Sequence, residues 1–153
     1  MPRTDTPADV AAAIHDADSI FLAAHENPDG DAVGSLLALR SILLSLGKSV
    51  HAATPTAPPD RFRFLDGFGA ISTAAPADQA DLGIALDCDG ADRLGDLEDP
   101  LLASHTVIDI DHHGGPEPFG ELQLVDAGAA ATAVLVMDVI RALGAQDLTE
   151  EQA

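Results

Sequence analysis

Carboxylate and imidazole side chains stand in three short clusters, each following an apolar run of the chain. The clusters are His25 with Asp29 and Asp31, Asp87 with Asp89 and Asp92, and Asp111 with His112 and His113. Several anions held together repel one another unless positive charge lies between them, and a divalent ion or a pair of ions is the simplest source of that charge. Carboxylates and imidazoles without thiolates suit Mn²⁺, Mg²⁺, Fe²⁺ or Zn²⁺. The excess of carboxylate favours Mn²⁺, with Mg²⁺ as the alternative.

A pair of divalent ions about 3.5–4 Å apart is the arrangement that hydrolyses phosphoesters. One ion holds the attacking hydroxide, and the pair neutralises charge on the phosphoryl oxygens. Metal rather than lysine would then supply the positive charge, in a chain with 7 basic and 26 acidic residues and a formal net charge of −19. That charge otherwise counts against unassisted binding to nucleic acid, which normally needs a basic patch.

The elements that position these clusters can be read from the apolar pattern. Strands are expected at residues 19–25, 48–53, 81–87, 106–111 and 121–125, helices at 2–18, 31–46 and 129–143, and a helical turn at 60–65. Strands that are apolar throughout and alternate with helices are typical of a parallel sheet covered on both faces. The sequence therefore predicts an α/β fold: a three-layer, doubly wound, mostly parallel sheet with helices on both faces. In such folds ligands bind at the carboxyl ends of the strands, which is where the clusters stand.

Length and composition limit the class of protein. A chain of 153 residues, 46% of them hydrophobic, is expected to form one domain with an aliphatic core. The single cysteine, Cys88, excludes a disulfide framework and a thiolate zinc site. No apolar stretch approaches the roughly 20 residues of a membrane span, and the first residues have no apolar signal core. We therefore expect a cytoplasmic protein with no membrane partner.

Together, the clusters resemble the motifs of a known family. The run from His25 to Ser35, His-Glu-Asn-Pro-Asp-Gly-Asp-Ala-Val-Gly-Ser, resembles the first motif of the DHH phosphoesterase superfamily. The run from Asp87 to Gly95 looks like the second, and Asp111-His112-His113 is the motif that names the family. The wording of the first motif is most similar to the nanoRNase branch. The resemblance implies a phosphoesterase that acts on short oligonucleotides or nucleotide phosphates, as an oligoribonuclease and 3′-phosphoadenosine 5′-phosphate phosphatase, by attack of a metal-bound hydroxide.

The resemblance also implies a role for each site residue. His25 and Asp29 would bind the first metal, Asp31 and His112 the second, and Asp87 would bridge both. His113 would face the scissile phosphate, and Asp111 would orient the histidines. Thr132 stands where the family has a Ser/Thr pair, with Ala131 in the other place, which leaves a substrate contact there open. From the residues alone, Asp89 or Asp92 could replace Asp87 as the ligand.

One part of the family pattern has no match. The family completes its second metal site with an Asp on a later strand and adds a C-terminal substrate-binding domain, and Asp138 and Asp147 are poor substitutes for that Asp. We therefore expect residues 1–153 to be a single DHH domain that is incomplete at its C-terminus. The full-length protein could form a homodimer. Two alternatives stay open: an enzyme like the manganese-dependent inorganic pyrophosphatases, or a non-catalytic module that binds metal or nucleotide.

Overall fold

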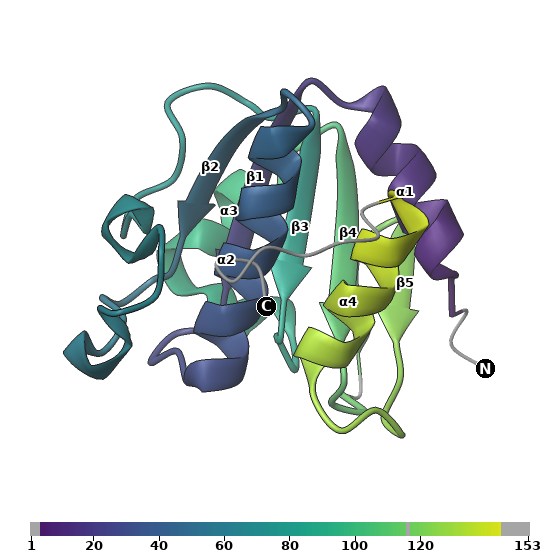
Figure 1. Ribbon diagram of the computed structural model, residues 1–153. Coiled ribbons are helices and arrows are strands. Elements are labelled where there is room, and N and C mark those ends of the chain that lie inside the picture. The colour runs from purple at the N-terminus through teal and green to yellow at the C-terminus, as the bar shows by residue number, and fades with distance from the viewer. Residues whose placement is uncertain (1–3, 116, 145–153) are drawn as a thin grey trace.

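A five-stranded parallel sheet forms the centre of the computed structural model, which describes residues 4–115 and 117–144. The strands are β1 (Ser19–Ala24), β2 (Ser49–Ala53), β3 (Leu82–Leu86), β4 (Thr106–Asp111) and β5 (Leu122–Val125). Their order across the sheet is β2-β1-β3-β4-β5, and every neighbouring pair is parallel (Figure 1). The chain thus moves outward in opposite directions from β1 and from β3. This makes the gap between them the topological switch point of a doubly wound sheet.

Three helices cover one face of the sheet: α1 (Pro7–Asp16), α2 (Gly30–Ser45) and α4 (Thr132–Ala142) (Figure 1). Their apolar side chains, such as Ile14, Leu36 and Val136, form one core with Leu22 and Ile84 of the sheet. Because successive strand residues point to opposite faces, each central strand also supplies a second core.

The second core lies on the opposite face and is smaller. Phe21 and Ala85 from the strands pack there with Leu94, Leu97 and Leu101. The three leucines come from a 3-10 segment, Ala91–Leu97, and a short helix, α3 (Glu98–Leu102). Helices therefore lie on both faces, and the predicted α/β architecture is confirmed.

The strands match the prediction to within one residue at each end, whereas the helices differ more. Helix α1 begins at Pro7 because Thr6 caps it: the Thr6 hydroxyl accepts from the Asp9 amide, and the Asp9 carboxylate accepts from the Thr6 amide. Of the predicted helix at residues 2–18, Pro2 and Arg3 lie outside the described residues. Helix α4 spans 132–142 rather than 129–143, and the turn predicted at 60–65 is a 3-10 turn over Asp60–Phe62.

The segment at residues 91–102 was not predicted as helix. Leu94, Leu97 and Leu101 are spaced as on one face of a helix, but Gly95, with φ of +52°, breaks the segment into a 3-10 piece and a five-residue helix. In the part of the chain that the structure describes, no helix combines the length and apolar character that crossing a membrane requires.

Candidate metal centre

The three polar clusters meet at one edge of the sheet. Strands β1, β3 and β4 are neighbours, and His25, Asp87 and His112 are each the first residue beyond one of them. Asp29 is the N-cap of α2, and Asp31 lies in its first turn. The carboxyl ends of parallel strands thus bring together side chains that are up to 87 positions apart in sequence, from His25 to His112. We call His25, Asp29, Asp31, Asp87, His112 and His113 the edge site.

Asp87 lies at the centre of the edge site. Its Oδ2 atom is 3.3 Å from Nε2 of His25, and its Oδ1 atom is 3.5 Å from Nε2 of His112. Asp29 lies 3.8 Å from Nε2 of His25 on the first side, and Asp31 lies 3.5 Å from Nε2 of His112 on the second. The two oxygens of one carboxylate therefore face two different groups of ligand atoms.

The backbone at Asp87 has an unusual conformation that aims this carboxylate. Asp87 has φ of +62°, in the left-handed region that few residues other than glycine adopt, although Asp and Asn do so more readily than most. The residue is 1% exposed, so its charge is removed from solvent. Thr132 donates a hydrogen bond from Oγ1 to Oδ1 of Asp87 at 2.9 Å, which holds the side chain in place.

Two of the imidazole rings are oriented by hydrogen bonds at Nδ1. In His25, Nδ1 lies 2.6 Å from the carbonyl oxygen of Glu26, so it must be the protonated nitrogen and Nε2 faces Asp87. In His113, Nδ1 lies 2.7 Å from Oδ1 of the buried Asp111. Outer contacts of this kind fix the tautomer and the direction of a ligating ring. A nitrogen that holds a proton for Asp111 cannot bind a metal, so the His113 ring would use Nε2 for any further contact.

The electrostatics of the edge site favour bound positive charge. The hydrogen bond with Asp87 is the main reason that the pKa of His25 is raised above its ordinary value, and the Glu26 carbonyl and the charge of Asp29 add to the rise. The pKa of His113 is also raised: burial lowers it, but the hydrogen bond and the negative charge of Asp111 outweigh the burial. Burial acts to raise the pKa of Asp87, yet the hydrogen bonds from His25 and Thr132 lower it overall. Without a metal, protons on the imidazoles balance part of the negative charge.

The donor set fits divalent ions. Ligand atoms of His25, Asp29 and Asp87 lie within 4.8 Å of one another, and Nε2 of His112 lies 3.5 Å from an oxygen of Asp31 and from one of Asp87. One ion with bonds of about 2.1 Å to each atom needs spacings close to these. Oxygen and imidazole donors without sulfur suit Mn²⁺ and also Mg²⁺ or Zn²⁺.

Asp31 has a structural role that the sequence did not indicate. Its two carboxylate oxygens accept the backbone N–H groups of Thr132 at 3.0 Å and of Ala133 at 2.9 Å. These are the first amides of α4, whose own N-cap, Ala131, supplies no side-chain hydrogen bond. Asp31 thus caps α4 from another helix, and a carboxylate has enough lone pairs to accept these bonds and still bind an ion.

Thr132 has contacts in the edge site that the sequence did not predict. It is fully buried, and it joins the edge site through its backbone to Asp31 and through its hydroxyl to Asp87. The available signal was a threonine at the start of a helix that follows a strand, on the same edge as the clusters. The structure places it as a support for Asp87.

The other candidates lie away from the ligand atoms. Asp89 and Asp92 are exposed, and Asp89 belongs to a tight contact in which a Cβ on Gly115 would lie 2.5 Å from its carbonyl oxygen. Asp87 is therefore the member of its cluster that faces the histidines. Asp138 pairs with Arg141 on α4, and Asp147 lies outside the described residues.

Comparison with known proteins shows the family of the chain. Residues 19–153 match the family described as "DHH family, N-terminal domain". The chain is 38% identical over 130 residues to the bifunctional oligoribonuclease and PAP phosphatase NrnA of Thermus thermophilus, covering 83% of this chain and 38% of that protein. It is 27% identical to the protein of the same name from Bacillus subtilis, over 80% of this chain and 38% of that protein. The chain thus spans 38% of the length of these curated relatives.

Solved structures share the fold. An exopolyphosphatase-related protein from Bacteroides fragilis superposes with a TM-score of 0.83 at 30% identity, over 90% of this chain and 44% of that one. The exonuclease RecJ of Thermus thermophilus in complex with Mn²⁺ superposes with a TM-score of 0.58 at 20% identity, over 95% of this chain and 22% of that one. The second similarity concerns the fold alone.

Proposed function

Since the chain belongs to the DHH family, through that family's N-terminal domain, we propose that the edge site hydrolyses phosphoester bonds in short oligonucleotides or nucleotide phosphates. The proposed cofactors are two divalent ions, Mn²⁺ in the first place and Mg²⁺ as the alternative. The observation that supports this most directly is the carboxylate of Asp87, whose two oxygens face different groups of ligand atoms. The names of the relatives, which include an oligoribonuclease and PAP phosphatase, support the substrate class.

Each residue of the edge site has a distinct task in this proposal. His25 and Asp29 would hold one ion, Asp31 and His112 the other, and Asp87 would bridge them. Ions bound there would lower the pKa of a bound water and place positive charge at the phosphoryl oxygens.

His113 would act on the substrate directly. Asp111 fixes its Nδ1 and helps to raise the pKa of the ring, which favours the protonated form, so that Nε2 would donate to a phosphoryl or leaving oxygen. Asp111 is in this sense a positioning residue, and it contacts His113.

Metal titration tests the site independently of turnover. Calorimetry with Mn²⁺ should detect two sites, and Asp87→Asn should weaken both because it removes a ligand charge from each. Asp92→Asn is the matched control, since it removes one exposed carboxylate five positions away, in the 3-10 segment that follows. One weak site in the unmutated chain, insensitive to Asp87→Asn, would instead favour the non-catalytic module.

Substrate comparison then separates the enzyme classes. With Mn²⁺, hydrolysis of a dinucleotide and of 3′-phosphoadenosine 5′-phosphate should be faster than hydrolysis of pyrophosphate. The reverse order would select the pyrophosphatase alternative. That residues 1–153 form a single domain, that the protein can form a homodimer and that it is cytoplasmic remain predictions.

A further inference from the structure

Positive and aromatic side chains are concentrated in residues 60–70, which we call the aromatic segment. Phe62, Phe64 and Phe68 are three of the five phenylalanines of the protein, and Arg61 and Arg63 are two of its seven basic residues. The segment consists of two 3-10 turns between β2 and β3, Asp60–Phe62 and Phe68–Ala70. In a chain of net charge −19, such a local concentration calls for a physical reason.

One phenylalanine of the segment, Phe64, is exposed to solvent. Phe64 is 82% exposed, about twice the exposure of any other large apolar side chain in the described residues. Arg63 is also exposed and makes one ion pair, at 2.8 Å, with Asp60 three positions earlier. The guanidinium of Arg61 lies over the Phe62 ring, 4.6 Å from its centroid. Phe64, which directly follows Arg63 in sequence, is too exposed to contribute to the core, so core packing does not explain it.

The aromatic segment is attached to the edge site. A Cβ on Gly30 would lie 3.6 Å from the Phe62 ring, so this ring rests on the first residue of α2, between Asp29 and Asp31 in sequence. The loop before the segment is also tied to the site, because the amide of Asn27 donates to the hydroxyl of Thr56 at 2.7 Å. Figure 1 shows the segment beside α2 and next to the outer strand β2, and it begins near the carboxyl edge.

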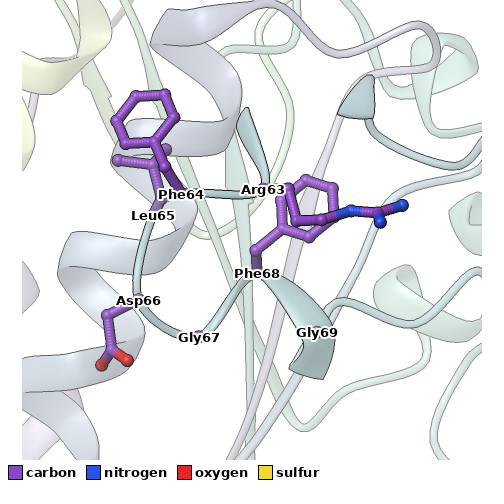
Figure 2. A pocket seen from close by; sticks show the side chains of 7 residues that line it. All are labelled: Arg63, Phe64, Leu65, Asp66, Gly67, Phe68 and Gly69. Atoms are coloured by element: carbon purple, nitrogen blue, oxygen red, sulfur yellow. The ribbon is translucent and has the colours of Figure 1, made fainter. Parts of the chain in front are cut away.

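A hollow of about 590 Å³ lies within the segment. Residues 63–69 line it, and Figure 2 shows Arg63 and Phe68 extending to one side of the turn while Phe64 and Leu65 extend to another. The guanidinium of Arg40, on α2, packs close to Gly67 and adds a third positive group to this region.

Two other basic residues make their contacts away from the edge site and do not provide a phosphate contact there. Lys48 donates to the carbonyls of His15 and Ala17 at the far end of the sheet, and Arg141 pairs with Asp138 on α4. Among the described residues, Arg93, which faces Glu26 at 3.8 Å, is the other basic group next to the edge site. Among the described residues, Arg93 and the aromatic segment are therefore the places near the edge site where a phosphate flanking the scissile one could meet a positive side chain.

We propose that the aromatic segment is the binding platform for the single-stranded flank of the substrate, where Phe64 stacks on a base and Arg63 contacts a phosphate. The proposal rests on the proposed function, since it assumes an oligonucleotide in the edge site. Proteins that bind single strands without sequence preference combine aromatic stacking with cationic contacts to the backbone, which is the pair of groups present here.

Binding of a labelled RNA tests the platform. The probe is fluorescein-labelled penta-adenylate, measured by anisotropy with Ca²⁺ in place of Mn²⁺ to avoid turnover. Phe64→Leu keeps an apolar side chain but removes the π-face, and we expect it to weaken binding roughly 5- to 150-fold, the range for loss of one base–aromatic stack. Phe64→Trp should bind as tightly as the unmutated chain or more tightly. Equal affinity of Phe64→Leu and the unmutated chain would overturn the stacking role.

The salt dependence of the same measurement tests the phosphate contact. Loss of one phosphate contact lowers the slope of log affinity against log salt by about 0.7 for a single strand. Arg63→Gln should show this loss, while Phe64→Leu should leave the slope unchanged. Arg141→Gln is a matched control: both arginines are exposed, by 72% and 66%, and each pairs with an Asp three positions earlier. The same slope change in both arginine variants would overturn the contact at Arg63.

Kinetics separate this proposal from the proposed function. With Mn²⁺, Phe64→Leu should raise KM for the pentanucleotide and leave that for 3′-phosphoadenosine 5′-phosphate unchanged, because the smaller substrate does not extend to the platform. If the protein hydrolyses its substrates but the variants at Phe64 and Arg63 bind RNA as the unmutated chain does, the platform proposal is overturned and the proposed function is not. RNA binding that depends on Phe64 and Arg63, without metal-dependent hydrolysis, would support the platform and overturn the proposed function. Absence of both would overturn both.

Discussion

Asp109, on the central strand β4, is a buried carboxyl group that should make the stability of this protein fall with rising pH. It is 2% exposed, and its Oδ1 atom has no hydrogen-bond partner among the described residues. Burial, followed by the negative charge of Asp111, raises the pKa of Asp109 to about 8, against the opposing effect of the Phe119 amide. The folded protein therefore keeps a proton at neutral pH that the unfolded chain has released.

The sign and size of the effect follow from proton linkage. The free energy of unfolding changes by about 1.4 kcal/mol per pH unit for each proton by which the folded and unfolded states differ. It falls with rising pH where the folded state binds more protons than the unfolded state. For Asp109 that window runs from the unfolded value near 3.8 up to about 8. Between pH 5 and pH 7, Asp109 alone should lower the free energy of unfolding by about 2–3 kcal/mol. The whole free energy of unfolding of a domain is typically about 5–15 kcal/mol, so this is a substantial part of it.

The substitution Asp109→Asn removes the titration and keeps the shape. We expect the stability of the variant, relative to the unmutated chain, to rise by about 2–3 kcal/mol from pH 5 to pH 7. Urea unfolding followed by far-UV circular dichroism measures this, since the chain has no Trp or Tyr for fluorescence. EDTA should be present, because a bound cation would lower the pKa of nearby carboxyl groups. Exposed Asp78 provides the control, Asp78→Asn, for the loss of one formal charge.

Comparing the variant with the unmutated chain isolates Asp109 from other titrations. His25 and His113, whose pKa values are raised, also lose stabilisation as pH rises, but only above about 6.5, and they do so in both proteins. Parallel stability curves for Asp109→Asn and the unmutated chain between pH 5 and pH 7 would refute the reasoning.

Three further predictions concern the supports of the site and of the fold. Thr132→Val, which keeps the shape but removes the donor to Asp87, should weaken Mn²⁺ binding about 10- to 100-fold by calorimetry, whereas Thr132→Ser should preserve it. Mn²⁺ binding should release protons near pH 6.5, because the ion displaces the proton favoured by the raised pKa of His25; calorimetry in buffers of different ionisation enthalpy would measure the number, and no release would contradict it. Thr6→Ala should cost about 1 kcal/mol in urea unfolding by removing the capping box of α1, and Thr6→Ser should restore the stability.

The sheet and the convergence of the site could be predicted because both follow from short-range pattern. An apolar run such as residues 81–87 has few alternatives to a buried strand, and parallel strands place the residues after them at one edge. Because His25, Asp87 and His112 each come directly after a strand, their proximity follows from the topology. No knowledge of side-chain conformation was needed for that prediction.

What could not be predicted depends on contacts between distant elements. The capping of α4 by Asp31 joins residues 101 positions apart, and no local signal at Thr132 indicates it. The second core depends on the leucines of residues 91–102, where a glycine with positive φ interrupts a segment whose leucines have helical spacing, so that two short helical pieces form in place of one helix. A helical turn was predicted for residues 60–65 of the aromatic segment, but the position of the segment beside the edge site depends on the packing of Phe62 on Gly30.

The edge site explains how so acidic a fold can hold three carboxylates and three imidazoles together before any ion binds. Two features of the structure reduce the repulsion. Amides at the start of α2 and α4 donate to Asp29 and Asp31, so the positive ends of two helices face the site. Imidazoles with raised pKa values supply mobile positive charge beside Asp87. A divalent ion would displace the proton of His25 but leave the amides in place, so the ligands would keep their positions when the proton is exchanged for a metal ion. Metal affinity and proton release are therefore linked properties of the edge site, whereas the fall of stability between pH 5 and pH 7 belongs to Asp109.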